Sequence, residues 1–193
     1  KTNEDLKFAR FDGANWNIET LDSEGDVGSY TSLVYTANGQ PAISYIDTSN
    51  KSLKFASPEG GSWAFETVDN QGGSGYSNSL NIGPNGVLAI AYTSSFPTPM
   101  KYAYNDGDGW VLSTIVDPID SNVGYWPSLQ FAPDGFPAIA HFGHTGNYLS
   151  ISRYDGEKWN QETVDVNNAG YGGNSLAFDS NDLPSIAYSG QNA

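Results

Sequence analysis

The sequence predicts an all-β fold assembled from four copies of one unit, and three observations support this. A tryptophan recurs at Trp16, Trp63, Trp110 and Trp159, positions that are 47, 47 and 49 residues apart. Short apolar strands alternate with turns rich in Gly, Asn and Asp, so the hydrophobic period is two, as in a strand. Glycine (22 residues) and aromatic side chains (13%) are abundant, which is typical of turn-rich β proteins.

Each unit is expected to hold four antiparallel strands. An alternating Leu-Lys-Phe-Ala strand, or a variant of it, begins at Leu6, Leu53, Met100 and Leu149. A glycine turn and the repeated Trp follow, and that second strand ends at Asp22, Asp69, Asp117 and Asp165. The third strand carries Ser-Leu. The fourth reads Ile-x-Tyr, or Ile-Ala-His in the third copy, after a hairpin turn such as Asn38-Gly39, which is a strong hairpin signal.

A period of 40 to 50 residues with four strands per repeat is the sequence signature of a β-propeller blade. We therefore predict a four-bladed β-propeller in a single domain, 1–193, with repeats at 5–51, 52–98, 99–147 and 148–193. Helical repeats of this length are excluded by the period of two. A β-sandwich gives no reason for one sequence unit to recur four times.

The phase of the repeat predicts how the fold closes. We name the Ser-Leu strand A (innermost), Ile-x-Tyr B, Leu-Lys-Phe-Ala C and the Trp strand D. The chain then begins with C and D, continues through three complete blades, and ends with A and B. Pairing 6–22 with 175–188 would complete a fourth blade and leave no exposed sheet edge. Closure within one chain, head-to-tail closure between chains as a larger ring or filament, and a fragment of a longer propeller all remain open.

The blade pattern of Leu-Lys-Tyr-Ala, Gly-x-x-Trp, Val-Asp, Gly-x-Tyr-x-Ser-Leu, Gly-x-Pro and Ile-Ser-Tyr resembles the repeat propellers of many secreted bacterial proteins. The resemblance covers all 193 residues. It implies a secreted, extracellular protein with a lectin-like or adhesive role, and no single activity is attached to the blade. The Gly-x-x-Trp turn is also similar to the Asp-box of sialidase propellers, although Asp12 and Asp155 here directly precede the glycine. That turn is expected to be structural.

The net charge limits the possible partners. Twenty-two acidic and eight basic residues give a formal charge of −14. Such a field repels nucleic acid and anionic membranes, so neither nucleic-acid binding nor membrane insertion is expected. The acidity is explained by solubility or by an affinity for cations. The chain has no cysteine, which excludes disulfides, thiol catalysis and cysteine-based zinc sites.

Departures from the repeat predict the ligand site. Antiparallel parity places the D–A and B–C loops at one end of the blades, and the D–A loops are long, as functional loops often are. The third D–A loop is two residues longer than the others, carries a Trp outside the repeat, and belongs to the blade that holds both histidines. An aromatic platform beside a hydrogen-bonding histidine is typical of a carbohydrate site. The predicted ligand-binding residues are Trp126, Tyr125, His144, Asp120, Tyr30, Tyr76 and Tyr171.

Residues common to all four units are expected to be structural. The repeated Trp side chains should pack between blades, and the repeated Asp side chains should accept backbone N–H bonds where D turns into A. His141 should pack where other units have Tyr. The serines at the start of strand A are predicted to line the central channel, where an ion or a water has room: Ser32, Ser79, Ser128 and Ser175.

No cofactor and no metal-binding residue is predicted. Residues 105–109 resemble a calcium loop in composition only, since they lack the 12-residue spacing and terminal Glu of an EF-hand. No catalytic residue is predicted either, because the sequence shows no Ser-His-acid constellation and contains only two arginines, Arg10 and Arg153.

The sequence thus favours a non-catalytic extracellular module that binds a carbohydrate or another surface ligand through the D–A/B–C loops. One alternative is a structural propeller that self-assembles through its terminal half-blades, for example in cell adhesion. A second alternative is a glycosidase-like hydrolase, which needs two carboxyl groups with different roles about 5–9 Å apart.

Overall fold

The computed structural model describes residues 4–70, 77–94, 100–115, 123–143, 148–166 and 169–190, without the side chains of Val123 and Tyr171. The chain separates into two compact units, Lys1–Gly75 and Tyr76–Ala193. The described residues form sixteen strands and no helix, which confirms the all-β prediction. None of these residues belongs to a helix able to span a membrane. The prediction of one domain over 1–193 stays a prediction.

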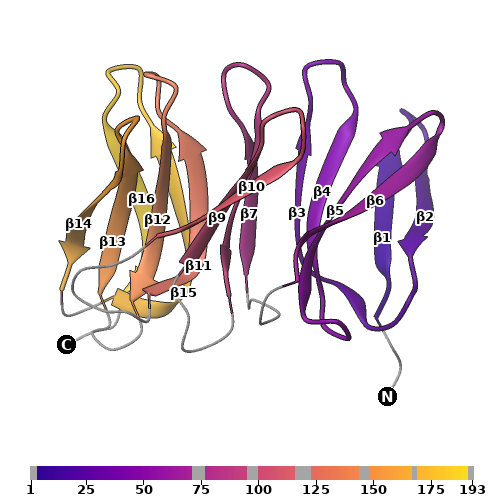
Figure 1. Cartoon of the computed structure of the whole chain (residues 1–193), viewed down its shortest axis with the longest axis horizontal. Coiled ribbons are helices and arrows are strands. Elements are labelled where there is room, and N and C mark those ends of the chain that lie inside the picture. Colours follow the sequence, from indigo (N-terminus) through magenta and orange to yellow (C-terminus); the bar gives the residue numbers. More distant parts are fainter. Residues whose placement is uncertain are drawn as a thin grey trace. The chain divides into compact units, whose positions relative to one another are not determined.

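The first unit contains a two-stranded and a four-stranded antiparallel sheet (Figure 1). The two-stranded sheet pairs β1 (Leu6–Phe11) with β2 (Trp16–Asp22). The four-stranded sheet has the order β3 (Val27–Tyr35), β4 (Pro41–Asp47), β5 (Ser52–Glu59) and β6 (Ser62–Asp69). Strands that follow one another in sequence are therefore neighbours in the sheet, which confirms the predicted order A–B–C–D.

The second unit contains two more sheets of this kind and a final hairpin (Figure 1). One sheet consists of β7 (Asn78–Ile82), β8 (Leu88–Thr93), β9 (Met100–Asn105) and β10 (Trp110–Thr114). The next consists of β11 (Val123–Phe131), β12 (Pro137–Gly143), β13 (Leu149–Tyr154) and β14 (Trp159–Asp165). The hairpin pairs β15 (Ala169–Phe178) with β16 (Pro184–Gly190). The fold is propeller-like, with three complete four-stranded sheets where three complete blades were predicted.

The terminal hairpins form two separate two-stranded sheets, and the described ladders do not include the predicted four-stranded sheet that combines them. Several of their side chains are exposed at positions where the complete blades bury the equivalent residue. Ala9 is exposed, whereas Ala56 and Ala103 are fully buried. Leu33, on the A strand that follows the first hairpin, is 47% exposed, whereas the equivalent Leu176 is 1% exposed.

Successive A strands are joined by the repeated serines. The Ser79 hydroxyl accepts a hydrogen bond from the backbone N–H of Leu129 (3.0 Å), and the Ser128 hydroxyl accepts one from Leu176 N–H (3.0 Å). The Leu176 side chain packs on Ala138 and its neighbours in the preceding sheet. These two serines therefore dock one blade on the next. Their predicted role in lining a channel stays a prediction, as it does for Ser32 and Ser175.

Two of the repeated tryptophans pack between sheets, as predicted. The ring of Trp63 on β6 lies 5.4 Å from that of Phe8 on β1, and the ring of Trp159 on β14 lies 5.2 Å from that of Tyr102 on β9. Trp16 differs, because it is 66% exposed and contacts Phe11 of its own hairpin. Among the described residues of unit 1, no sheet precedes β1 on which Trp16 could pack in the same way.

The repeated Asp at the end of strand D ties that strand to the next sheet. Asp22 Oδ1 accepts the Glu24 N–H (3.1 Å), as predicted, and Asp22 Oδ2 accepts the Tyr45 hydroxyl (2.7 Å) and pairs with Lys54. Burial acts to raise the pKa of Asp22, but the bonds from Lys54 and Tyr45 outweigh it and the pKa is lowered. In unit 2 the Tyr188 hydroxyl likewise donates to Asp165 (2.8 Å).

Candidate ligand-binding pockets at the blade junctions

The predicted loop site is only partly placed. His144, Asp120 and Tyr76 lie outside the described residues, and so does the side chain of Tyr171. Tyr125, Trp126 and Tyr30 are placed, but the structure does not bring the whole predicted set together. The loop site therefore stays a prediction.

Trp126, which lies outside the four repeated Trp positions, shares its backbone conformation with Tyr30. Like Tyr30 it lies two residues before the Ser of strand A, and both have a positive φ, 55° and 51°. The ladder register shifts at both places, so each residue sits in a bulge where the strand bends. The Trp126 N–H donates to Ser77 Oγ (3.1 Å), and its side chain packs on Phe142 and Leu149. Trp126 thus contributes to packing as well as to the surface.

His141 is fully buried, and its Nε2 lies 3.0 Å from the Ser152 hydroxyl. Its counterparts Tyr45 and Tyr92 are also buried. The prediction that His141 packs in place of a tyrosine is confirmed.

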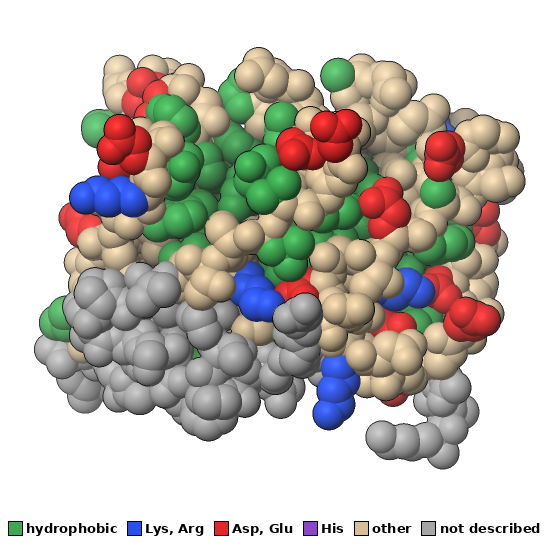
Figure 2. Space-filling view, in the orientation of Figure 1, with side chains coloured by type: hydrophobic (Ala, Val, Ile, Leu, Met, Phe, Trp, Pro, Cys, Tyr) green, Lys and Arg blue, Asp and Glu red, His purple; other side chains and the backbone are tan. Residues whose placement is uncertain are grey.

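Two pockets of the described structure lie at the opposite end of the blades, beside the A–B and C–D turns. In unit 2 a pocket of about 480 Å³ opens between the β9–β10 hairpin and the turns of the following sheet. Hydrophobic side chains gather there in Figure 2, over β9, β10 and β14. The lining residues are Tyr102, Tyr104, Val111, Ser113, Phe136, Pro137, Tyr154, Glu157, Lys158 and Trp159.

Five aromatic rings form a connected wall in this pocket, which we call the aromatic pocket. Tyr102 contacts Tyr104 (6.0 Å between centroids) and Trp159 (5.2 Å), while Tyr154 contacts Trp159 (5.5 Å) and Phe136 (6.1 Å). Phe136 is 39% exposed, so its ring is open to a ligand.

Turn geometry and polar groups complete the aromatic pocket. Gly156 has a φ of +99°, and a Cβ at that position would lie 3.2 Å from the Phe136 ring, so glycine permits the close approach. Asp155 Oδ1 accepts the N–H groups of Glu157 and Lys158, both at 2.9 Å, and these bonds shape the C–D turn that carries the two charged side chains. Burial raises the pKa of Tyr102, so its hydroxyl stays neutral across the physiological range.

A second pocket, of about 390 Å³, occupies the equivalent junction in unit 1, and we call it the polar pocket. The repeat alignment matches Phe8 with Tyr102 and Trp63 with Trp159, but elsewhere polar residues replace aromatic or small ones. Arg10 occupies the repeat position of Tyr104, Glu19 that of Ser113, and Gln40 that of Phe136. The full lining is Phe8, Arg10, Asp12, Asn17, Ile18, Glu19, Gln40, Pro41, Pro58 and Trp63.

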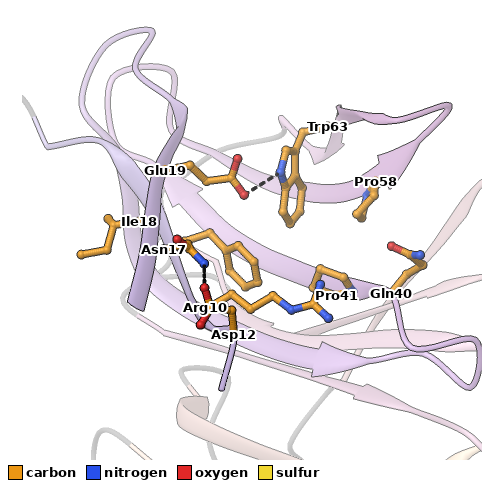
Figure 3. Close-up of a pocket in the computed structure, with 10 residues that line it drawn as sticks. Arg10, Asp12, Asn17, Ile18, Glu19, Gln40, Pro41, Pro58 and Trp63 are labelled. Atoms are coloured by element: carbon orange, nitrogen blue, oxygen red, sulfur yellow. Dashed lines mark hydrogen bonds between the residues drawn. The ribbon is translucent and has the colours of Figure 1, made fainter. Parts of the chain in front are cut away.

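Figure 3 shows how the side chains of the polar pocket lie. The Trp63 indole N–H donates to Glu19 Oε1 (3.3 Å), and the Arg10 guanidinium extends from the other side toward Pro41 and Gln40. Asp12 is held in its turn by the N–H groups of Ala14 and Asn15.

The sequence did not lead to these pockets because their residues lie on regular strands and short turns that were interpreted as scaffold. One signal was present. Two positions change chemical character between repeats: Arg10 corresponds to Ser57, Tyr104 and Arg153, and Gln40 corresponds to Val87, Phe136 and Leu183. In a repeat protein, such variation marks positions that the blade itself does not fix.

Comparisons with known proteins support the fold and give no information on activity. No protein-family model matches the sequence, and no curated protein matches it. An intramolecular trans-sialidase from Ruminococcus gnavus, solved with oseltamivir carboxylate, matches with a TM-score of 0.57 and 14% identity over 91% of this chain and 43% of its own. A putative 6-phosphogluconolactonase from Bacteroides uniformis matches with a TM-score of 0.52 and 11% identity over 90% and 57%. A fucose lectin from Kordia zhangzhouensis, solved with methyl-fucoside, matches with a TM-score of 0.48 and 16% identity over 70% and 99%.

The chain thus spans about half the length of the first two structures, which include enzymes, so the similarity supports a propeller-like fold and no particular activity.

Proposed function

We propose that this protein is a non-catalytic, extracellular module that binds carbohydrate, and that the aromatic pocket of unit 2 is a principal binding site. The observation that carries this proposal is the continuous wall of five aromatic rings around a pocket of about 480 Å³. Ligand pockets commonly have volumes of about 300–1,000 Å³, so one or two sugar rings fit.

The chemistry of the pocket suits a sugar. The C–H faces of a pyranose pack on aromatic rings, which bury apolar surface without desolvating the hydroxyl groups at the ring edge. Glu157 and Lys158 on the turn, with Ser113 on β10, offer an acceptor, a donor and a hydroxyl to those groups. A secreted location is implied by the resemblance to secreted bacterial repeat propellers.

Two acids of the C–D turns, Asp12 and Asp155, lack the property that a general acid requires. A general acid needs a raised pKa. Asp155 instead accepts the N–H groups of Lys158 and Glu157 and the side-chain amide of Asn160, which lower its pKa to about 2. The pKa of Asp12 is lowered for the same reason, by the N–H groups of Asn15 and Ala14. Both carboxylates accept hydrogen bonds within their own turns.

Substitution of Phe136 tests the proposal. We expect Phe136→Ala to weaken binding about 3- to 10-fold toward at least one glycan that the wild-type protein selects from an array, because one stacking surface is lost. Isothermal titration with that glycan measures the change, and circular dichroism checks the fold. Phe65→Ala is the matched control, since Phe65 is a similarly exposed aromatic (41%) that lines none of the pockets described above. Equal affinity of wild type and Phe136→Ala for every selected glycan would reject the aromatic pocket as a site.

The D–A/B–C loop site around Trp126 is the second candidate position. The half-buried Tyr125 and Trp126 side chains favour it, since they lie beside that end of β11. If binding depends on Trp126 and is unchanged in Phe136→Ala, the glycan binds at the loop end.

We further propose that the terminal hairpins combine into a fourth blade. The exposed Ala9 and Leu33 support this, because strand B of a complete blade would cover both. The same pairing between two chains would give the self-assembling alternative.

A further inference from the structure

We infer that the polar pocket of unit 1 is a second saccharide site with a different selectivity. It binds the vicinal hydroxyl groups of a neutral sugar, whereas the aromatic pocket contacts the apolar face of a sugar ring. This inference rests on the proposed function and adds a second site, with its own ligand chemistry, to it. The first ground is position, because both pockets arise where one C–D hairpin meets the turns and the Trp of the next sheet.

The second ground is an arginine with unused donors. Within the described part of the chain the Arg10 guanidinium forms neither a hydrogen bond nor an ion pair, whereas Lys54 is paired with Asp22. A guanidinium presents N–H groups in a fixed fork that suits two adjacent oxygen atoms. Figure 3 shows that this fork lies inside the pocket, beside Pro41 and Gln40.

The third ground is a positioned acceptor. The Trp63 N–H holds Glu19 Oε1 at 3.3 Å, which orients the carboxylate and leaves Oε2 to accept a hydroxyl proton. Arg10 and Glu19 thus supply donors and an acceptor, which is what a pair of neighbouring sugar hydroxyls requires. The Gln40 amide adds one group of each kind at the rim.

The charges select a neutral ligand. Asp12 and Glu19 lie in the same pocket as Arg10, and the chain carries a formal charge of −14, so an anionic ligand is repelled. A cationic ligand is repelled by the Arg10 guanidinium, which has the same sign of charge. A purely apolar ligand would remove the Arg10 and Glu19 charges from water without replacing their hydrogen bonds, which is costly.

The five tryptophans allow both pockets to be observed separately in one experiment. Each indole N–H gives one ¹H–¹⁵N signal, and single Trp→Phe variants assign the Trp63 and Trp159 signals. The probes are methyl glycosides of glucose, galactose, mannose, fucose and N-acetylglucosamine, together with O-methylated analogues that lack vicinal hydroxyls. We expect at least one methyl glycoside to shift the Trp63 signal saturably, and its O-methylated analogue to leave the signal in place.

Variants then connect the Trp63 response to the pocket. Arg10→Gln should weaken the apparent affinity at the Trp63 signal by about tenfold or more, since a charged hydrogen-bond donor is lost. Arg153→Gln removes the same charge in unit 2 and should leave that response unchanged. A Trp63 signal that no probe moves, or that moves equally in Arg10→Gln, overturns the inference. If Trp159 alone fails to respond, the aromatic pocket fails and this inference stands, so the two failures are distinguishable.

Discussion

The repeated acids of the C–D turns act as acceptors for the turn backbone. Asp12 and Asp155 each accept two N–H groups and one side-chain amide, from Asn17 and Asn160 respectively. The sequence showed the Asp-Gly pairing and its structural role. It could not show that both carboxylate oxygens accept hydrogen bonds, because that depends on where the Asn directly after the repeated Trp places its side chain.

These bonds predict how stability depends on pH. Because the pKa of Asp155 is about 2 in the folded protein, below the unfolded value near 3.8, its contribution is complete above about pH 4 and is lost as the pH falls toward 2. Asp12 and Asp179 change in the same direction. The melting temperature should therefore decrease as the pH falls from 4 to 2.

The Asp155→Asn variant checks this assignment. An Asn side chain still accepts N–H groups but does not titrate in this range, so its melting temperature should decrease less steeply between pH 4 and 2. Identical pH profiles for wild type and Asp155→Asn would show that the turn carboxylate is not responsible.

At the scale of strands and sheets, the sequence predicted the order A–B–C–D because hydrophobic alternation and turn residues are local properties. The contacts between sheets were predicted only in part. The packing of Trp63 and Trp159 followed from their size and repetition. The Ser79 and Ser128 bonds to the next A strand did not, because they depend on how far one sheet is displaced along its neighbour.

The serine bonds predict a measurable docking energy between sheets. Ser128→Ala leaves the Leu176 N–H without its acceptor, and we expect a loss of about 1–2 kcal/mol in the free energy of unfolding. Urea denaturation followed by tryptophan fluorescence measures it. Ser180→Ala, at an exposed turn position, should change stability by less than about 0.5 kcal/mol. Equal stabilities of the two variants would show that the bond contributes nothing.

The candidate site was harder to predict than the strands. The sequence analysis favoured the long loops, whereas the described pockets are formed by strand and turn positions from two neighbouring sheets. Arg10 and Gln40, for example, are 30 positions apart and line one pocket only because β1–β2 packs on the following sheet. Such a site becomes visible in sequence only when equivalent repeat positions are compared.

At the scale of the whole molecule, the central claim is that four equivalent blades share one plan and that the terminal hairpins supply the fourth. The complete blades give the expected register, since Ile43 lies opposite Ala56 and Ile90 opposite Ala103. In the proposed fourth blade, the same register would place Ile186 opposite Ala9. It would also place Lys7 beside Tyr188 and Asp165, which would repeat the group formed by Lys54, Tyr45 and Asp22.

Cysteine cross-linking tests this claim most directly, because the chain contains no cysteine of its own. Directly opposite residues of an antiparallel pair have Cα atoms about 4.5–5.5 Å apart, within the range that a disulfide spans. We predict that the double variant Ala9→Cys, Ile186→Cys, oxidised at low concentration, forms a disulfide within a single chain. The out-of-register pair Ala9→Cys, Ser189→Cys should remain reduced. Free thiols in the first variant, or disulfides found only between chains, would contradict a fourth blade closed within one molecule.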